Sequence, residues 1–250
     1  VILDRTLSGD SGTLIINNGE HERVFRFLQG VPVSATSTVQ DEDFTETMVS
    51  IGILERARLD WIRKHTGADE SETEALIGAG TISRDAVDSH HHVHIQHLIG
   101  AALSWPEGSY EWQANPTVND RFEATLLPRV DVIQALMCGV LGSFDLGALR
   151  TFIDASDAGD FLPDTRLASD PSPGWLPQDM QNIQSVLGQG YSREEMAENM
   201  GCDADRLAAL LWVLEAAGWL NRSSPPAALI PLGTVATIKA GQHEEPTPDP

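Results

Sequence analysis

The chain has 250 residues, 41% apolar and 21% charged, a composition typical of globular proteins and unlike that of disordered ones. Its 37 acidic residues outnumber 16 basic ones, and the net charge of −21 argues against binding to nucleic acid or anionic membranes, because both depend on clustered Lys and Arg. Cys138 and Cys202 form no CxxC pair, so zinc and redox chemistry are not indicated, and we expect a reducing, cytoplasmic location.

The N-terminus has neither a secretory leader nor an apolar run near the roughly 18 residues of a membrane span. We therefore expect neither secretion nor membrane insertion. The chain starts at Val1 rather than at a methionine, and Ile2, Leu3 and Leu7 read like the end of a helix. This predicts a further segment upstream of Val1.

Residues 12–37 read as three strands of a small antiparallel meander. Asn18-Gly19 separates the first two, and an Asn-Gly pair between β-formers is a strong hairpin signal. A second turn at Gln29-Gly30 leads to a strand that contains Pro32. Because proline lacks the backbone donor that a central strand needs, this strand is predicted at a sheet edge.

Two segments, Glu46–Thr66 and Glu74–His94, align with each other at an offset of 28 residues. Each reads as a helix, a glycine that ends it, an apolar residue and a second helix. The sequence therefore predicts a repeat of two helical hairpins. The matched positions are Glu46 with Glu74, Gly52 with Gly80, Arg56 with Arg84 and Asp60 with Asp88, together with Met48, Val49 and Leu54 against Leu76, Ile77 and Ile82.

The second hairpin continues into a helix, predicted over Arg84–Ser104, that carries five histidines. The turn after Trp105 leads to a short strand, Tyr110–Trp112, which is predicted to rejoin the meander. The aromatic residues of this stretch are interpreted as closing the core between helix and sheet.

The histidine helix is the first place to look for metal or acid–base chemistry. Helical spacing places His91 and His94 towards the core, with His90 and His97 on one flank. His90 and His97 lie about 10 Å apart along the axis, too far to share one ion, so a metal site needs His94 with one of them and ligands from elsewhere. We predict structural histidines with no metal or cofactor, and keep as alternatives a metal site at His90, His94 and His97 and a pH-sensitive helix.

Catalytic signatures are incomplete. Gly9-Asp10-Ser11-Gly12 copies the nucleophile motif of chymotrypsin-like proteases, but only ten residues precede Ser11, where that fold needs its histidine and acid. We interpret these residues as a polar turn. The common hydrolase, nucleotide and metalloprotease motifs are absent, so no catalytic residue is predicted.

The C-terminal part predicts a helical unit. Ser192 and Glu195 form a capping-box pattern, and Gly201 separates that helix from a leucine-rich one, which resembles a helix-turn-helix. Between Pro177 and Arg222 there are seven acidic residues, three arginines and no lysine. This charge favours protein contact over DNA binding.

We predict an α+β fold with a small all-α, winged-helix-like second domain. The α+β domain, a meander packed with helical hairpins, covers residues 1–153. A linker of acidic residues, Pro and Ser follows at 154–174, the winged-helix-like domain at 175–222 and a Pro-rich tail at 223–250.

Several ordered motifs carry a family resemblance: Gly12-Thr-Leu-Ile-Ile16, then Phe27-Leu-Gln-Gly-Val-Pro-Val-Ser-Ala35, then paired helices that end in Leu98 to Trp112. Over roughly residues 1–160 the chain resembles the bacterial PatA-like N-terminal domain family. The resemblance implies a non-enzymatic signalling module, often fused to receiver domains in regulators of motility, development or small GTPases. It supplies no catalytic residue.

The paired hairpins also look like the N-terminal domain of secretion and pilus ATPases, some of which bind cyclic di-GMP. The Arg-Leu-Gly that opens that binding motif is missing before Met48 and before Leu76.

The functional hypothesis is a cytoplasmic, non-enzymatic scaffold in bacterial signal transduction, concerned with motility, polarity or development. Its expected partners are other proteins, such as a response regulator or a small GTPase, with self-association left open. The first alternative is a ligand sensor that binds a metal through the histidine helix or a cyclic dinucleotide through the hairpins. The second is a DNA-binding regulator.

Overall fold

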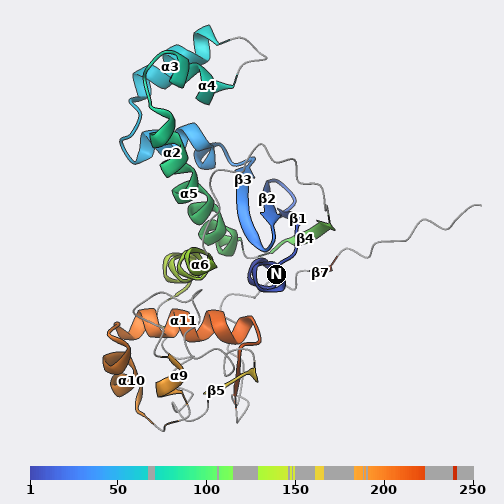
Figure 1. The fold of residues 1–250 in the computed structure, drawn as a ribbon, viewed down its shortest axis with the longest axis vertical. Helices are drawn as coiled ribbons and strands as arrows, with labels where there is room; N and C mark the ends of the chain where they lie inside the picture. Colours follow the sequence, from blue (N-terminus) through green and yellow to red (C-terminus); the bar gives the residue numbers. More distant parts are fainter. Residues whose placement is uncertain are drawn as a thin grey trace, which may run out of the picture.

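The computed structural model in Figure 1 describes most of the chain. The described residues are 1–66, 71–105, 107–114, 129–145, 147, 149, 161–165, 183–187, 189, 191–222 and 239–240. The predicted linker and Pro-rich tail lie largely outside them. None of the described helices is long and apolar enough to cross a membrane.

A mixed sheet forms one layer of the fold. Strands β1 (Gly12–Asn17), β2 (Glu22–Leu28) and β3 (Val31–Ser37) make the predicted antiparallel meander. Strand β4 (Ser109–Ala114) returns antiparallel to β1, and β7 (Lys239–Ala240) lies parallel to β4, giving the order β3-β2-β1-β4-β7. The return of the chain to the meander and the edge position of β3 are both confirmed.

The main core lies between this sheet and the helices on one of its faces. Leu14, Phe25 and Phe27 are fully buried, because alternate residues of each strand face the same side. Trp112 of β4 packs edge-on against Phe27, with ring centroids 5.8 Å apart. The guanidinium of the buried Arg23 pairs with Glu42 and lies 3.6 Å from the ring centroid of Trp105.

Helix α1 (Ile2–Ser8) packs beneath the sheet and confirms the helical reading of the first residues. Two longer helices cover the same side: α5 (Arg84–Ala101), continued by the 3-10 turn η2 (Ala102–Ser104), and α6 (Arg129–Ser143). Helices α5 and α6 cross where Gly100 meets Gly139. A Cβ atom added to Gly139 would lie 2.5 Å from the carbonyl oxygen of Gly100, so the crossing requires glycine.

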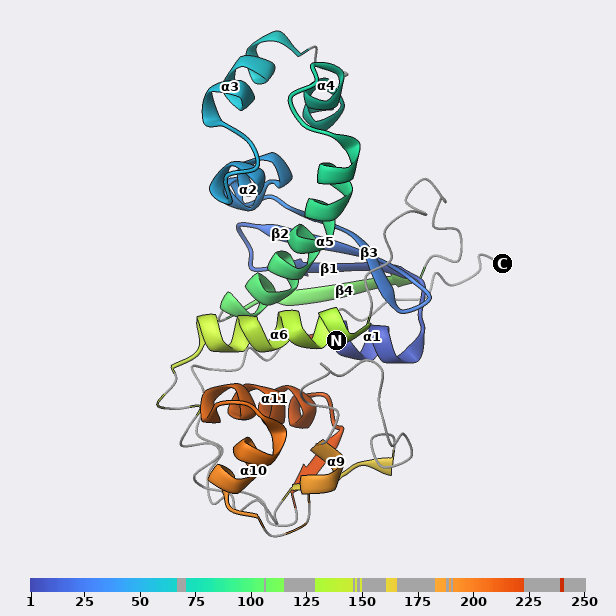
Figure 2. The same ribbon diagram turned by 60° about the vertical axis from the view of Figure 1, so that its left-hand side comes forward.

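The two predicted hairpins form the end of the molecule farthest from the C-terminal helices (Figures 1 and 2). After the 3-10 turn η1 (Gln40–Glu42), the first hairpin is α2 (Phe44–Ser50) and α3 (Arg56–His65). The second hairpin is α4 (Glu72–Gly78) and the start of α5. We call residues 44–66 and 71–90 the hairpin unit.

The two hairpins turn in the same way, which confirms the repeat in three dimensions. The glycine that ends each first helix has a positive φ, 78° at Gly52 and 66° at Gly80, a conformation that glycine adopts without strain. The amide of Ile53 donates to Met48 O, and the amide of Thr81 donates to Leu76 O. Matched residues also bury together in a small second core made of Met48, Leu54, Leu59 and Ile62 with Leu76, Ile82 and Val87.

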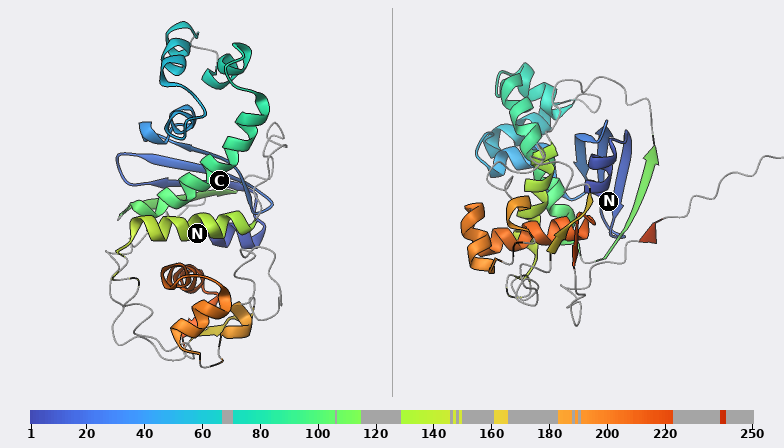
Figure 3. Two further views of the ribbon diagram at one scale, coloured as in Figure 1. Left: turned by 90° about the vertical axis from the view of Figure 1, so that its left-hand side faces the viewer. Right: turned by 60° about the horizontal axis from the view of Figure 1, so that its bottom comes forward.

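The C-terminal unit packs against α6 (Figure 3, left). It contains α9 (Ile183–Val186), α10 (Arg193–Met200) and α11 (Ala204–Ala216), and the predicted capping box of Ser192 with Glu195 is present. Its apolar residues belong to the same buried cluster as the main core, so the two units share one core through α6 and α11.

The predicted linker contains a strand. Within residues 154–174, β5 (Phe161–Pro163) pairs antiparallel with β6 (Leu220–Arg222), and Phe161 is buried in the main core. The segment was predicted to be a linker because it is rich in Asp, Ser and Pro. That composition does not reveal the short apolar stretch at Phe161 and Leu162, which forms β5.

Candidate functional site

The histidines of α5 are not arranged as the spacing predicted. His94 is buried as expected, with 3% of its surface exposed, but His90 is equally buried, at 2%. His91 is only half-buried, and His97 is exposed. The spacing placed His91, rather than His90, with His94 towards the core, whereas the structure buries His90 more deeply than His91 because α2 packs over the flank that carries His90.

Each of three histidines makes one hydrogen bond to a different element. The Nε2 of His94 donates to Glu42 O of η1 at 2.8 Å, and that of His91 donates to Val33 O of β3 at 3.2 Å. The Thr47 hydroxyl already donates to Phe44 O, so it accepts from the Nε2 of His90 at 2.9 Å. All three rings thus carry their hydrogen on Nε2.

The three imidazoles also surround one aromatic ring. The ring centroid of Phe44 lies 5.1 Å from that of His90, 5.8 Å from that of His91 and 5.3 Å from that of His94. These side chains therefore join α5 to α2, η1 and β3. We call His90, His91, His94 and Phe44 the histidine layer.

Burial keeps the layer uncharged. It lowers the pKa of His90 to about 4, with a further lowering by His94, and it also lowers the pKa values of His91 and His94. Neutral imidazole is the form that binds metals, yet the described part of the chain brings no three His, Cys, Asp or Glu side chains together as a metal site. His90 and His94, whose ring centroids are 6.3 Å apart, pack against Phe44 instead, His90 with its ring tilted and His94 edge-on.

Ser11 has a structural contact in its turn. Its Oγ accepts a hydrogen bond from the amide of Gln29 at 2.8 Å, which ties the start of β1 to the second turn of the meander. The neighbouring Asp10 pairs with Arg5. These contacts support the interpretation of this motif as a polar turn.

Arginine–carboxylate pairs hold the hairpin unit together. The buried carboxylate of Glu46 binds both Arg56 and Arg63, and Arg63 reaches across to Glu72 at 3.0 Å. The hydrogen bonds from Arg56 and then from Arg63 lower the pKa of Glu46 to about 2. In the second hairpin the matched residues, Glu74 and Arg84, form the equivalent pair.

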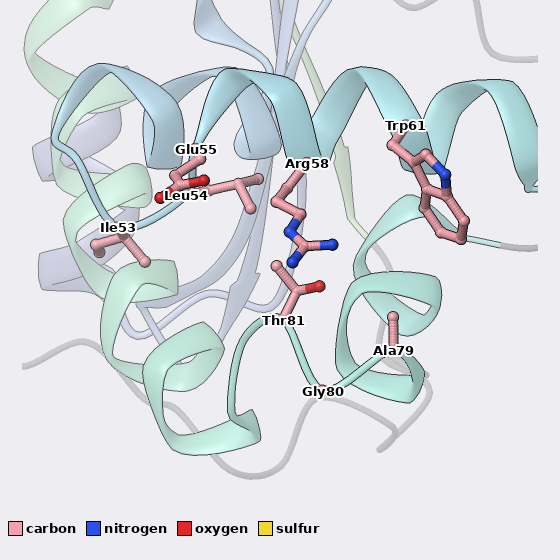
Figure 4. Close-up of a pocket in the computed structure, with 8 residues that line it drawn as sticks. All are labelled: Ile53, Leu54, Glu55, Arg58, Trp61, Ala79, Gly80 and Thr81. Atoms are coloured by element: carbon pink, nitrogen blue, oxygen red, sulfur yellow. The ribbon is translucent and has the colours of Figure 1, made fainter.

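A cavity of about 500 Å³ opens between the two hairpins (Figure 4). We call it the hairpin cavity, and its lining residues are Ile53, Leu54, Glu55, Arg58, Trp61, Ala79, Gly80 and Thr81. The side chain of Arg58 extends from α3 towards Thr81, and the indole of Trp61 lies above the turn at Ala79 (Figure 4).

Apolar surface is concentrated around this cavity. The side chains of Ile51, Ile53 and Trp61 are 53%, 42% and 51% exposed. One side of the Trp61 indole stacks on His65, with centroids 4.4 Å apart and planes 21° apart. All three residues belong to the first hairpin, and Ile53 and Trp61 line the hairpin cavity.

The second helix of the predicted helix-turn-helix, α11, packs against two other helices. Seven of its residues are buried, and it packs on α6 on one side and on α10 on the other. Arg206 donates to Gln134 of α6 at 3.2 Å, and Trp212 packs against Phe144, with ring centroids 5.0 Å apart. A helix that reads DNA bases must present one face to the major groove, and the contacts with α6 and α10 take up two sides of α11.

Comparison with protein-family models, with curated proteins and with solved structures returns no match. The resemblance to the PatA-like N-terminal domain family therefore stays a prediction.

Two residues of the cavity, Arg58 and Trp61, were missed by the sequence analysis. The 28-residue alignment contained the signal, since it places Arg58 opposite Ala86 and Trp61 opposite Ser89. The two hairpins therefore differ at these positions, and none of the four residues belongs to the small second core.

Proposed function

We propose that this chain is a non-enzymatic protein-interaction module of bacterial signal transduction, and that it binds another protein through the hairpin unit. One observation carries the proposal. Five large apolar side chains are exposed among the described residues, and three of them, Ile51, Ile53 and Trp61, belong to the first hairpin. Clustered exposed apolar side chains are typical of binding surfaces, whereas scattered ones are ordinary.

The polar groups of the described core support the same function. The histidine layer uses its Nε2 atoms in hydrogen bonds between elements, and Glu46 is held by two arginines. These contacts join elements of the fold, and the burial of His90, His94 and Glu46 keeps their side chains away from the surface. The family resemblance suggests a response regulator or a small GTPase as the partner.

Site-specific photocrosslinking tests this function. A photoreactive phenylalanine analogue replaces Ile51 in the full chain, and the chain is irradiated in lysate of the bacterium that encodes it. The matched controls carry the analogue at Ser89, exposed on α5, or at Leu162, a 44% exposed apolar residue of β5. We expect one discrete protein adduct from position 51 and none from the controls, and the same adducts from all three positions would contradict the proposal.

A ligand sensor is the second candidate, because the hairpin cavity has a volume in the range of small-molecule sites. Calorimetry with zinc and with cyclic di-GMP separates the two functions. A protein-interaction module gives no heat with either compound, whereas a sensor gives a saturable signal with one of them. DNA binding is the least supported candidate, since α11 is buried on two sides.

A further inference from the structure

We propose that the hairpin cavity binds a partner segment that carries one carboxylate next to an apolar side chain. Arg58 pairs with the carboxylate, while Trp61 and Ile53 contact the apolar group. This inference rests on the proposed protein-interaction function and adds the chemistry of the segment that is recognised.

Arg58 is the cation available for this contact. Of the four arginines in the described helices α2 to α5, three are paired: Arg56 with Glu46, Arg63 with Glu46 and Glu72, and Arg84 with Glu74. The guanidinium of Arg58 makes no hydrogen bond or ion pair with the described residues and extends into the cavity (Figure 4). Its five N–H donors suit a carboxylate, which they can bind in a two-pronged arrangement.

Trp61 supplies the apolar wall. It follows Arg58 by three residues on α3, so both side chains lie on one face of the helix, about 4.5 Å apart along its axis. Tryptophan and arginine together are the residues most enriched among the energetically dominant positions of protein interfaces.

Comparison of the two hairpins shows whether the hairpin fold requires Arg58 and Trp61. The second hairpin makes the same turn, buries the matched core residues and forms the matched Glu–Arg pair. It does so with Ala86 and Ser89 in place of Arg58 and Trp61, and with Thr81 in place of Ile53. The hairpin fold therefore does not require a large cationic and a large aromatic side chain here, which favours a role in binding.

The charges around the cavity limit the partner to a single carboxylate. Glu55 lines the same cavity and repels a second acidic group, and the net charge of −21 disfavours a strongly acidic partner. The spacing of Arg58 and Trp61 suits a carboxylate and an apolar side chain one helical turn apart on the partner, or close neighbours in an extended segment. The segment thus has one Asp, Glu or terminal carboxylate in an otherwise neutral or basic context.

The test uses a phage-displayed library of random 12-residue peptides selected on the full chain. Enriched peptides are synthesised, and their Kd values are measured by fluorescence polarisation for the wild type, Arg58→Ala, Trp61→Ser and Lys64→Ala. Lys64 lies exposed on the same helix outside the cavity lining and serves as the matched control. Thermal unfolding of each variant verifies folding, which the second hairpin predicts to be retained.

We expect peptides with one acidic residue beside an aromatic or aliphatic one. Arg58→Ala should weaken their binding by about five- to tenfold and Trp61→Ser by at least about tenfold, with no change for Lys64→Ala. As a charge-reversal check, Arg58→Glu should lose the acidic peptide and bind its Lys-substituted version more tightly than the wild type does.

Three results would overturn the inference: no enriched peptide, enriched peptides without a carboxylate, or Kd values that are the same for Arg58→Ala and the wild type. A saturable calorimetric signal with cyclic di-GMP that Arg58→Ala abolishes would assign the cavity to a nucleotide and also overturn it. Crosslinking from position 51 in lysate uses neither the peptides nor Arg58, so failure of the inference and failure of the proposed function remain distinguishable.

Discussion

At the scale of single residues, the histidine layer shows how burial sets the chemistry of a side chain. His90 occupies the position that Ile62 holds in the first hairpin, and both are buried. The imidazole of His90 is neutral because burial disfavours its charged form. Three of the five histidines on α5, namely His90, His91 and His94, therefore act as packing and hydrogen-bonding groups.

This burial predicts a loss of stability in acid. The folded pKa of His90, about 4, lies below the ordinary value of 6.5, so the unfolded chain binds more protons between these two pH values. The contribution of His90 is present above about pH 6.5 and is lost as the pH falls towards 4. Thermal unfolding from pH 7.5 to 4.5 should show a smaller loss for His90→Ile than for the wild type. The exposed His97→Ala is the control, and an unaltered pH dependence in His90→Ile would contradict the assignment.

Glu46 and Glu74 form a second matched pair for experiment. Glu46 is buried between two arginines, whereas the Glu74 side chain is 57% exposed. Glu46→Gln should reduce the free energy of unfolding by about 1–2 kcal/mol, because Arg63 and Arg56 lose a charged acceptor in a partly dry site. Glu74→Gln should change it by less than about 0.5 kcal/mol, as exposed pairs contribute little. Urea unfolding of both variants measures the difference, and equal effects would refute the argument.

At the scale of elements, the crossing of α5 and α6 holds the layers together. The backbones meet at Gly100 and Gly139 without side chains between them, which lets α6 lie against α5 and also contact α11. Substitution here acts on every layer of the fold, because α6 belongs to the core shared by the two units.

Gly139→Ala should therefore destabilise the protein. The new methyl group would meet the Gly100 carbonyl at 2.5 Å, and overpacking of this kind costs about 1–3 kcal/mol. Gly142→Ala is the control on the same helix, where a Cβ meets no atom within 4 Å and the higher helix propensity of alanine should stabilise by up to about 1 kcal/mol. Differential scanning calorimetry should show opposite shifts in Tm, and shifts of the same sign would argue against the crossing.

The sequence was most informative where one local rule governs the backbone. The Asn-Gly turn, the edge position set by Pro32 and the glycine stops of the two hairpins all follow from backbone preferences, and the structure confirms them. It was least informative where a second element decides burial. The helical spacing of α5 placed His90 on a flank rather than in the core, because the sequence of that helix does not show where α2 packs. Arg58 and Trp61 were not predicted for a related reason: the repeat is defined by the residues that its two copies share, and these two differ from the matched Ala86 and Ser89.

At the scale of the whole molecule, the hairpin cavity and the shared core are separated in space. The hairpin unit lies at one end, the C-terminal unit at the other, and the sheet with α5 and α6 lies between them (Figures 2 and 3). The exposed apolar side chains of the first hairpin are remote from the shared core, so they can be changed without loss of that core. The proposed partner contact therefore lies at the end of the molecule opposite the C-terminal unit (Figure 2).

Partner binding by the first hairpin is tested by the affinity of the chain for the protein that is crosslinked from position 51. Its Kd is measured by biolayer interferometry for the wild-type chain and for the double variant Ile53→Thr, Trp61→Ser, which copies the matched residues of the second hairpin. We predict that the double variant keeps the wild-type Tm and binds the partner at least about tenfold more weakly. An unchanged Kd would contradict the assignment of partner binding to this hairpin.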